Sequence, residues 1–128
     1  MGRRSRRRAA AGRSEGAGRL SAPTSDYRDG EGNTLTLRGS LSAASRREYA
    51  RALAGEGRPS ATREDAWARA GELLFERLAV RWSIAGVPLE GQRELRARYR
   101  MASQAERRWV REALREHCAE NFPDLRAP

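Results

Sequence analysis

Residues 63–85, REDAWARAGELLFERLAVRWSIA, decide the fold that the sequence predicts. Apolar side chains recur along this stretch at spacings of three and four, and the main row is Trp67, Leu74, Leu78 and Trp82. This spacing predicts one long helix over 63–85. Its broad apolar face is typical of a central helix that contacts two neighbours. The segment AGVP that follows, with Gly86 and Pro88, is expected to end the helix.

Three further helices are predicted at about 43–54, 89–101 and 104–121. Capping boxes support three of the four helix starts. Ser45 opens one box, with Ser42 as an alternative cap one turn earlier, and Thr62 and Ser103 open the other two. Each box precedes apolar residues at helical spacing, so the helices follow from two independent features.

A β element is predicted at 27–38, because residues 34–38 alternate polar and apolar side chains. Tyr27 and Arg28 are placed to pair back as a short hairpin. The expected fold is therefore mainly α: a small four-helix bundle with a short N-terminal strand or hairpin, forming one domain over 26–128. Residues 1–25 lack apolar periodicity and are predicted to be a disordered, arginine-rich arm.

All 26 basic residues are arginine, and the formal net charge is +9. The first twenty residues carry seven arginines and a single acid, Glu15. They are interpreted either as an arm that neutralises phosphates or as translated sequence upstream of the true start. The absence of lysine favours the codon bias of a GC-rich genome over selection for guanidinium groups.

The apolar content is low for a folded domain. Leu, Ile, Val and Phe together make up about 14% of the chain, so the tryptophans must supply much of the core. A small, thin core is marginally stable, and association with a partner or a second copy would stabilise it.

Enzymatic chemistry is not expected. The one histidine and the one cysteine are neighbours, His117 and Cys118, and consecutive helical residues diverge by about 100° instead of facing each other. We interpret Cys118 as a core residue and His117 as a residue at the boundary of the core, and we predict no metal and no cofactor. A lone cysteine is typical of a reducing, cytoplasmic protein, and the chain lacks the apolar run of about 18 residues that would span a membrane.

The positive excess outside the N-terminal segment lies in residues 93–115. Seven arginines there are candidates for contacts with phosphate or nucleic acid: Arg93, Arg96, Arg100, Arg107, Arg108, Arg111 and Arg115. Arg108, Arg111 and Arg115 are predicted to share one helix face. The alternative is a solvated polar face on which Glu112 offsets its arginine neighbours.

These features favour a small non-catalytic module for protein interaction or assembly, with a protein partner or a second copy as ligand. The composition also suits an origin in a bacterial mobile element or phage. The alternative is a nucleic-acid-binding protein that uses the basic 93–115 face together with the N-terminal arm.

Overall fold

The computed structural model describes residues 5–8, 23–55, 62–125 and 127. The chain divides into two compact units, each built from two separate segments. Unit 1 holds the described residues up to Ser40 together with Leu78–Met101. Unit 2 holds the described residues of 41–77 and of the segment that begins at Ala102.

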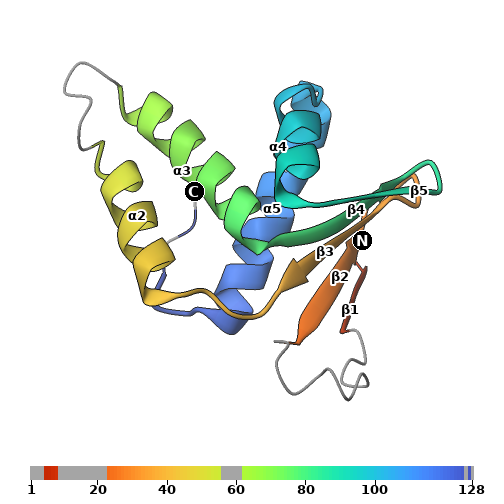
Figure 1. Cartoon of the computed structure of the whole chain (residues 1–128), viewed down its shortest axis with the longest axis horizontal. Helices are drawn as coiled ribbons and strands as arrows, with labels where there is room; N and C mark the ends of the chain where they lie inside the picture. The colour runs from red at the N-terminus through yellow and green to blue at the C-terminus, as the bar shows by residue number, and fades with distance from the viewer. Residues whose placement is uncertain (1–4, 9–22, 56–61, 126, 128) are drawn as a thin grey trace. The chain divides into compact units, whose positions relative to one another are not determined.

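Unit 1 is an antiparallel sheet with one helix. The strands lie in the order β1-β2-β3-β4-β5, which is also their order along the chain (Figure 1). Their bounds are Ser5–Arg8, Thr24–Arg28, Thr34–Arg38, Ala79–Ile84 and Val87–Glu90. The predicted disordered segment 1–25 thus contributes β1 and the start of β2, and its remaining residues up to 22 lie outside the described part.

The strand register separates an apolar face of the sheet from a polar one. Leu35 pairs with Tyr27 on one side and with Trp82 on the other, and all three side chains are buried. The opposite face carries the Thr36 hydroxyl, which donates to the Asp26 carboxylate at 2.7 Å. The helix α4 (Gln92–Arg100) contacts β4 and β5.

The expected four-helix bundle is wrong, because the chain is an α+β protein with a multi-stranded antiparallel sheet. The helix predicted over 63–85 ends at Leu78, and the next residue already belongs to β4. Residues 80, 82 and 84 are Val, Trp and Ile, a period-2 pattern of strand-forming residues. The same stretch also fits helical spacing, and the helix predicted over 63–85 followed the helical pattern. Pairing with β3 selects the strand, since β3 otherwise lacks a partner on that side.

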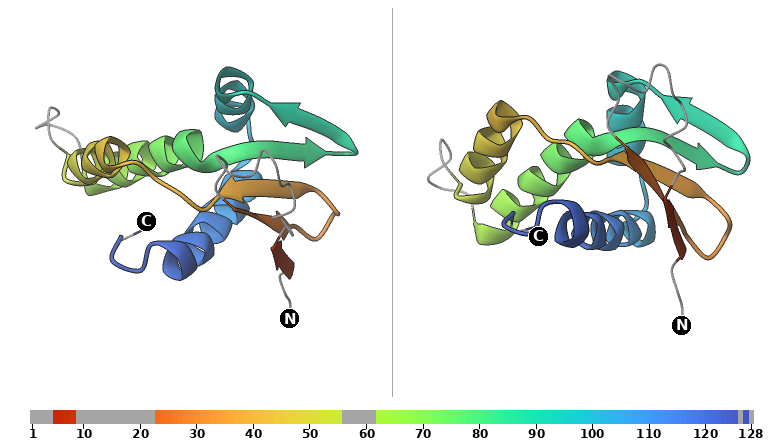
Figure 2. Two further views of the ribbon diagram at one scale, coloured as in Figure 1. Left: turned by 60° about the horizontal axis from the view of Figure 1, so that its bottom comes forward. Right: turned by 90° about the horizontal axis from the view of Figure 1, so that it is seen from below.

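The Ala85-Gly86 pair forms a hairpin turn instead of ending a helix. The β4–β5 hairpin that it closes is visible in both views of Figure 2. Both residues have positive φ, 53° and 80°, as a type I′ turn requires. The Ala85 N–H donates to the Asn33 side-chain oxygen at 2.9 Å, which ties this turn to the tip of the β2–β3 hairpin.

Pro88 lies in β5, where the sequence suggested a helix stop. Ile84 and Val87 flank the two-residue turn and therefore exchange hydrogen bonds with each other. The next pair, Ser83 and Pro88, alternates to the opposite orientation, so the Pro88 nitrogen points away from β4. A proline is tolerated there because β5 is an edge strand, and no strand of the described residues pairs with its outer side.

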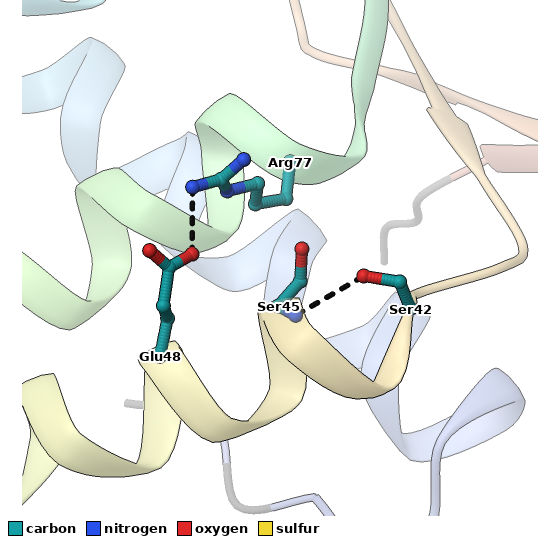
Figure 3. A network of polar contacts seen from close by, with 4 residues as sticks. All are labelled: Ser42, Ser45, Glu48 and Arg77. Carbon is teal, nitrogen blue, oxygen red and sulfur yellow. Dashed lines mark hydrogen bonds and ion pairs between the residues drawn. The ribbon is translucent and has the colours of Figure 1, made fainter.

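Unit 2 contains the helices α2 (Ala43–Leu53), α3 (Arg63–Leu78) and α5 (Gln104–Asn121), and the last residue of α3 already belongs to unit 1. Ser42 caps α2, since its hydroxyl accepts the Ser45 N–H at 3.1 Å (Figure 3). On the same helix, Glu48 accepts a hydrogen bond of 2.7 Å from the Arg77 guanidinium of α3 (Figure 3).

The predicted capping boxes at the other two helices are confirmed. The Thr62 hydroxyl accepts the Asp65 N–H at 3.0 Å, and the Asp65 carboxylate accepts the Thr62 N–H at 3.3 Å. Ser103 and Glu106 make the same reciprocal pair at the start of α5. On α5, five buried side chains form one face: Val110, Ala113, Leu114, His117 and Cys118.

Candidate functional site

Three of the candidate arginines share one flank of α4. Leu95 and Tyr99 are buried at 2% and 6% exposure, which fixes the rotation of the helix. Arg93, Arg96 and Arg100 lie at i, i+3 and i+7 and therefore on the same side of the helix. Arg93 and Arg100 are exposed and Arg96 is half-buried, so the stripe borders solvent.

A fourth arginine of α4, Arg98, takes a different role. Its guanidinium carbon lies 5.2 Å from the centre of the buried Trp82 ring, a cation–π arrangement. The helix therefore uses one arginine to contact the sheet and presents the other three on its outer flank.

An apolar row adjoins the α4 arginines. Ala97 is exposed, and Met101, one turn further on, is 81% exposed. Exposed methionine at this level is unusual for a side chain that has three rotatable bonds and prefers apolar surroundings. The sequence does not distinguish Met101 as a candidate, because one methionine at a helix end carries no periodic signal.

The remaining candidates lie on α5 in unit 2. Arg108 and Arg115 are exposed on the side opposite the buried row of this helix, and Arg111 is half-buried at the edge of that row, one turn before Leu114. Arg107 is half-buried on the flank of the buried row. Glu112 lies within the exposed stripe, so the positive charge of α5 is partly offset. The seven candidate arginines thus divide between two units, and their contact with phosphate stays a prediction.

Trp67 on α3 is a functional candidate that the sequence assigned to the core. Ala66, Ala70 and Leu74 on the same side of α3 are at most 4% exposed, yet Trp67 between them is 47% exposed. Periodicity predicts that Trp67 faces the core, and the structure contradicts this for nearly half of its surface. The spacing of apolar residues does not show where the row stops being covered by other elements, so it cannot predict the exposure of Trp67.

Cys118 is buried in unit 2, as predicted, whereas His117 is fully buried and not at the boundary where the sequence placed it. Burial raises the pKa of the Cys118 thiol to about 11, and the nearby Arg46 guanidinium opposes this shift only in part. The thiol therefore stays protonated near neutral pH, whereas a nucleophile needs a thiolate. His117 packs edge-on against the Phe122 ring, with centroids 6.0 Å apart.

Within the described residues, no cluster of three or more His, Cys, Asp or Glu side chains could hold a metal ion. In the same part of the chain, every helix is too short or too polar to cross a membrane. No family model, curated protein or solved structure matches the chain.

Proposed function

We propose that this protein is a non-catalytic interaction or assembly module that binds a protein partner or a second copy through Trp67. The exposure of Trp67 carries this proposal, because the residues flanking it on the same side of α3 are buried. When a side chain in the core-facing row of a helix stays half exposed, a second protein can complete the packing around it.

The energetics favour an interface at this position. A tryptophan buries about 150–250 Å² when fully covered, and Trp67 retains about half of its surface for a partner. Burial at about 25 cal/mol per Å² makes this roughly 2–3 kcal/mol, the range of an interface hot spot.

The test compares Trp67→Glu with Val87→Glu. Val87 is 61% exposed on β5 in unit 1, so the control makes a similar apolar-to-acidic change at another exposed position. Sedimentation velocity over a concentration series measures self-association, and affinity capture from the native cells with mass spectrometry measures other partners. We expect the wild type and Val87→Glu to share an associated state that Trp67→Glu loses.

A monomer at all concentrations, with a capture profile that Trp67→Glu leaves unchanged, contradicts the proposal. Circular dichroism of each variant separates loss of binding from loss of folding. Trp67→Phe should retain most of the association, since it keeps an aromatic side chain at the same place.

The arginine stripes favour nucleic-acid binding as a second candidate function. Guanidinium groups in a row can follow a phosphate backbone, and their contacts weaken as salt rises. A mobility-shift salt series should show a steep slope that becomes shallower when residues 1–21 are deleted. It should also become shallower in a triple alanine variant of Arg108, Arg111 and Arg115, and absence of binding at low salt excludes this function.

A further inference from the structure

We propose that the polar face of the sheet in unit 1 binds a terminal phosphate group. The phosphate site consists of two hydroxyl groups and two guanidinium groups, those of Thr34, Ser83, Arg28 and Arg81. It goes beyond the proposed interaction function, because it uses none of the residues that the proposed interfaces use and specifies the class of a small ligand.

The strand register places the four side chains on one face of the sheet. The strands β2, β3 and β4 lie side by side (Figure 1). Thr34 of β3 pairs with Arg28 of β2 on one side and with Ser83 of β4 on the other, and directly paired residues point to the same face. Arg81 precedes Ser83 by two residues, so its side chain points to this face as well. The Cβ atoms of paired residues lie about 5 Å apart and those of diagonal neighbours about 7 Å apart, so the long arginine side chains can reach a ligand above the hydroxyl groups.

Two short hydroxyl side chains lie between the longer arginine side chains. Thr34 and Ser83 are half-buried, whereas Arg28 is exposed and the side chain of Arg81 is 42% exposed. Within the described residues, neither hydroxyl group has a hydrogen-bond partner. A ligand with oxygen acceptors would therefore accept hydrogen bonds from both hydroxyl groups and contact both guanidinium groups.

The acidic side chains on this face already accept hydrogen bonds. The Asp26 carboxylate accepts the Thr36 hydroxyl at 2.7 Å, and the Glu90 carboxylate accepts an N–H of Arg81 at 3.2 Å. The Arg81–Glu90 pair is exposed on both sides and therefore weak, and it leaves further N–H donors of Arg81 for a ligand. Arg28 makes no ion pair with another described residue. The site therefore keeps donors and positive charge for an anion.

The donors of the site match a terminal phosphate better than other biological anions. Guanidinium groups bind phosphate oxygens through two parallel hydrogen bonds, and hydroxyl groups add single ones. A terminal phosphate carries a charge of about −1.5 to −2 near neutral pH and three free acceptor oxygens. A phosphodiester or a carboxylate has a single charge and fewer free oxygens, so either would leave donors of the site without acceptors. The expected ligand class is therefore a phosphomonoester.

An NMR titration of the full-length protein tests the proposal. The ligand is methyl phosphate at a pH of about 8, where it is dianionic, and the comparison solutes are dimethyl phosphate and sodium chloride at equal ionic strength. We expect methyl phosphate to shift the amide signals of Thr34 and Ser83 until they saturate. Dimethyl phosphate should bind about fivefold more weakly, because it lacks one charge and one free oxygen, and chloride should give no saturable shift.

Variants test the two kinds of donor separately. Arg28→Ala should weaken methyl phosphate binding about tenfold, and Arg28→Lys should recover only part of the affinity, since lysine lacks the planar fork. Thr34→Val removes the hydroxyl group and keeps the shape of the side chain, so it should weaken binding about threefold. The matched controls are Arg51→Ala, at an exposed arginine of α2 in unit 2, and Thr24→Val, at the other end of β2 from Arg28. Both controls should leave the affinity unchanged.

Absence of a saturable shift at Thr34 and Ser83 overturns the proposal, and so does equal affinity for methyl phosphate and dimethyl phosphate. An equal loss of affinity in Arg28→Ala and Arg51→Ala also overturns it, because the net charge of the protein would then attract the anion. Trp67→Glu should leave methyl phosphate binding intact, so failure of the phosphate site and failure of the Trp67 interface are distinguishable.

Discussion

Replacing Ala85 by asparagine should stabilise the protein, which tests the hairpin that replaced the predicted helix end. Ala85 has φ of 53°, a left-handed conformation that alanine adopts only at a cost. Asparagine tolerates this conformation and is the preferred first residue of a type I′ turn before glycine. The backbone N–H that donates to Asn33 at 2.9 Å is retained in the variant.

The magnitude follows from the turn geometry. A left-handed conformation costs an ordinary residue about 1–2 kcal/mol, and asparagine recovers part of this by hydrogen bonding locally. We expect the free energy of unfolding of Ala85→Asn to rise by about 0.5–1 kcal/mol. For a chain of this length, that is a rise in Tm of roughly 2–4 °C. A helix over 63–85 predicts the opposite sign, because asparagine costs about 0.6 kcal/mol relative to alanine in a helix.

Urea unfolding followed by circular dichroism measures the difference, with Ala68→Asn as the control. Ala68 is an exposed residue inside α3, so this variant should lose about 0.6 kcal/mol. Ala85→Val should destabilise clearly more than Ala68→Val, since a β-branched residue fits positive φ poorly. If Ala85→Asn destabilises as much as Ala68→Asn, the left-handed turn is refuted.

Other predictions concern helix propensity, capping, the sheet edge and the buried thiol. Gly71→Ala should raise the free energy of unfolding by about 0.5–1 kcal/mol in urea titrations, because Gly71 lies inside α3 and an added Cβ meets nothing within 4 Å; a loss of stability would show that the space is occupied. Ser42→Ala should cost about 1 kcal/mol and Ser45→Ala much less, since the Ser42 hydroxyl caps α2; equal losses would contradict this assignment. Pro88→Val should increase concentration-dependent association above that of the wild type in sedimentation velocity, because it adds an outward N–H to the β5 edge; an association state equal to that of the wild type would show that the edge is already protected. For Cys118, the pKa raised from 9.0 to about 11 means that the unfolded thiol ionises first, so the free energy of unfolding should fall by about 2–3 kcal/mol between these pH values. The Cys118→Ala variant should lack this component, and identical pH profiles for variant and wild type would refute it.

The sequence predicted those helices and strands whose ends are determined by nearby residues, such as a capping side chain or an alternating pattern. The capping box at Ser103 and the alternation over 34–38 correspond directly to α5 and β3. Residues 79–84 were misassigned because Leu74, Leu78 and Trp82 fit a helical row and Val80, Trp82 and Ile84 fit a strand equally well. The choice depends on pairing with β3, a contact across some forty residues of sequence that no local pattern contains.

The candidate site was predictable in part for the same reason. The spacing of Arg93, Arg96 and Arg100 shows that they share a helix flank, and the structure retains this arrangement on α4. The exposure of Trp67 and Met101 depends on which surfaces other elements cover. Periodicity alone predicts that an apolar side chain in such a row is buried, and only the packing around it shows whether it is.

Each unit is built from two separate segments of the chain, so neither unit can finish folding until its second segment has been synthesised. The strand β3 ends at Arg38, but its partner β4 begins at Ala79, after α2 and α3 have been translated. The strands β1, β2 and β3 therefore leave the ribosome before β4, and the side of β3 that pairs with β4 is left open. Unit 2 closes only when α5 is complete at Asn121. A chain released before β4 would expose both unfinished units, so a nonsense mutation before Ala79 should yield a target for proteolysis instead of a shortened, folded fragment.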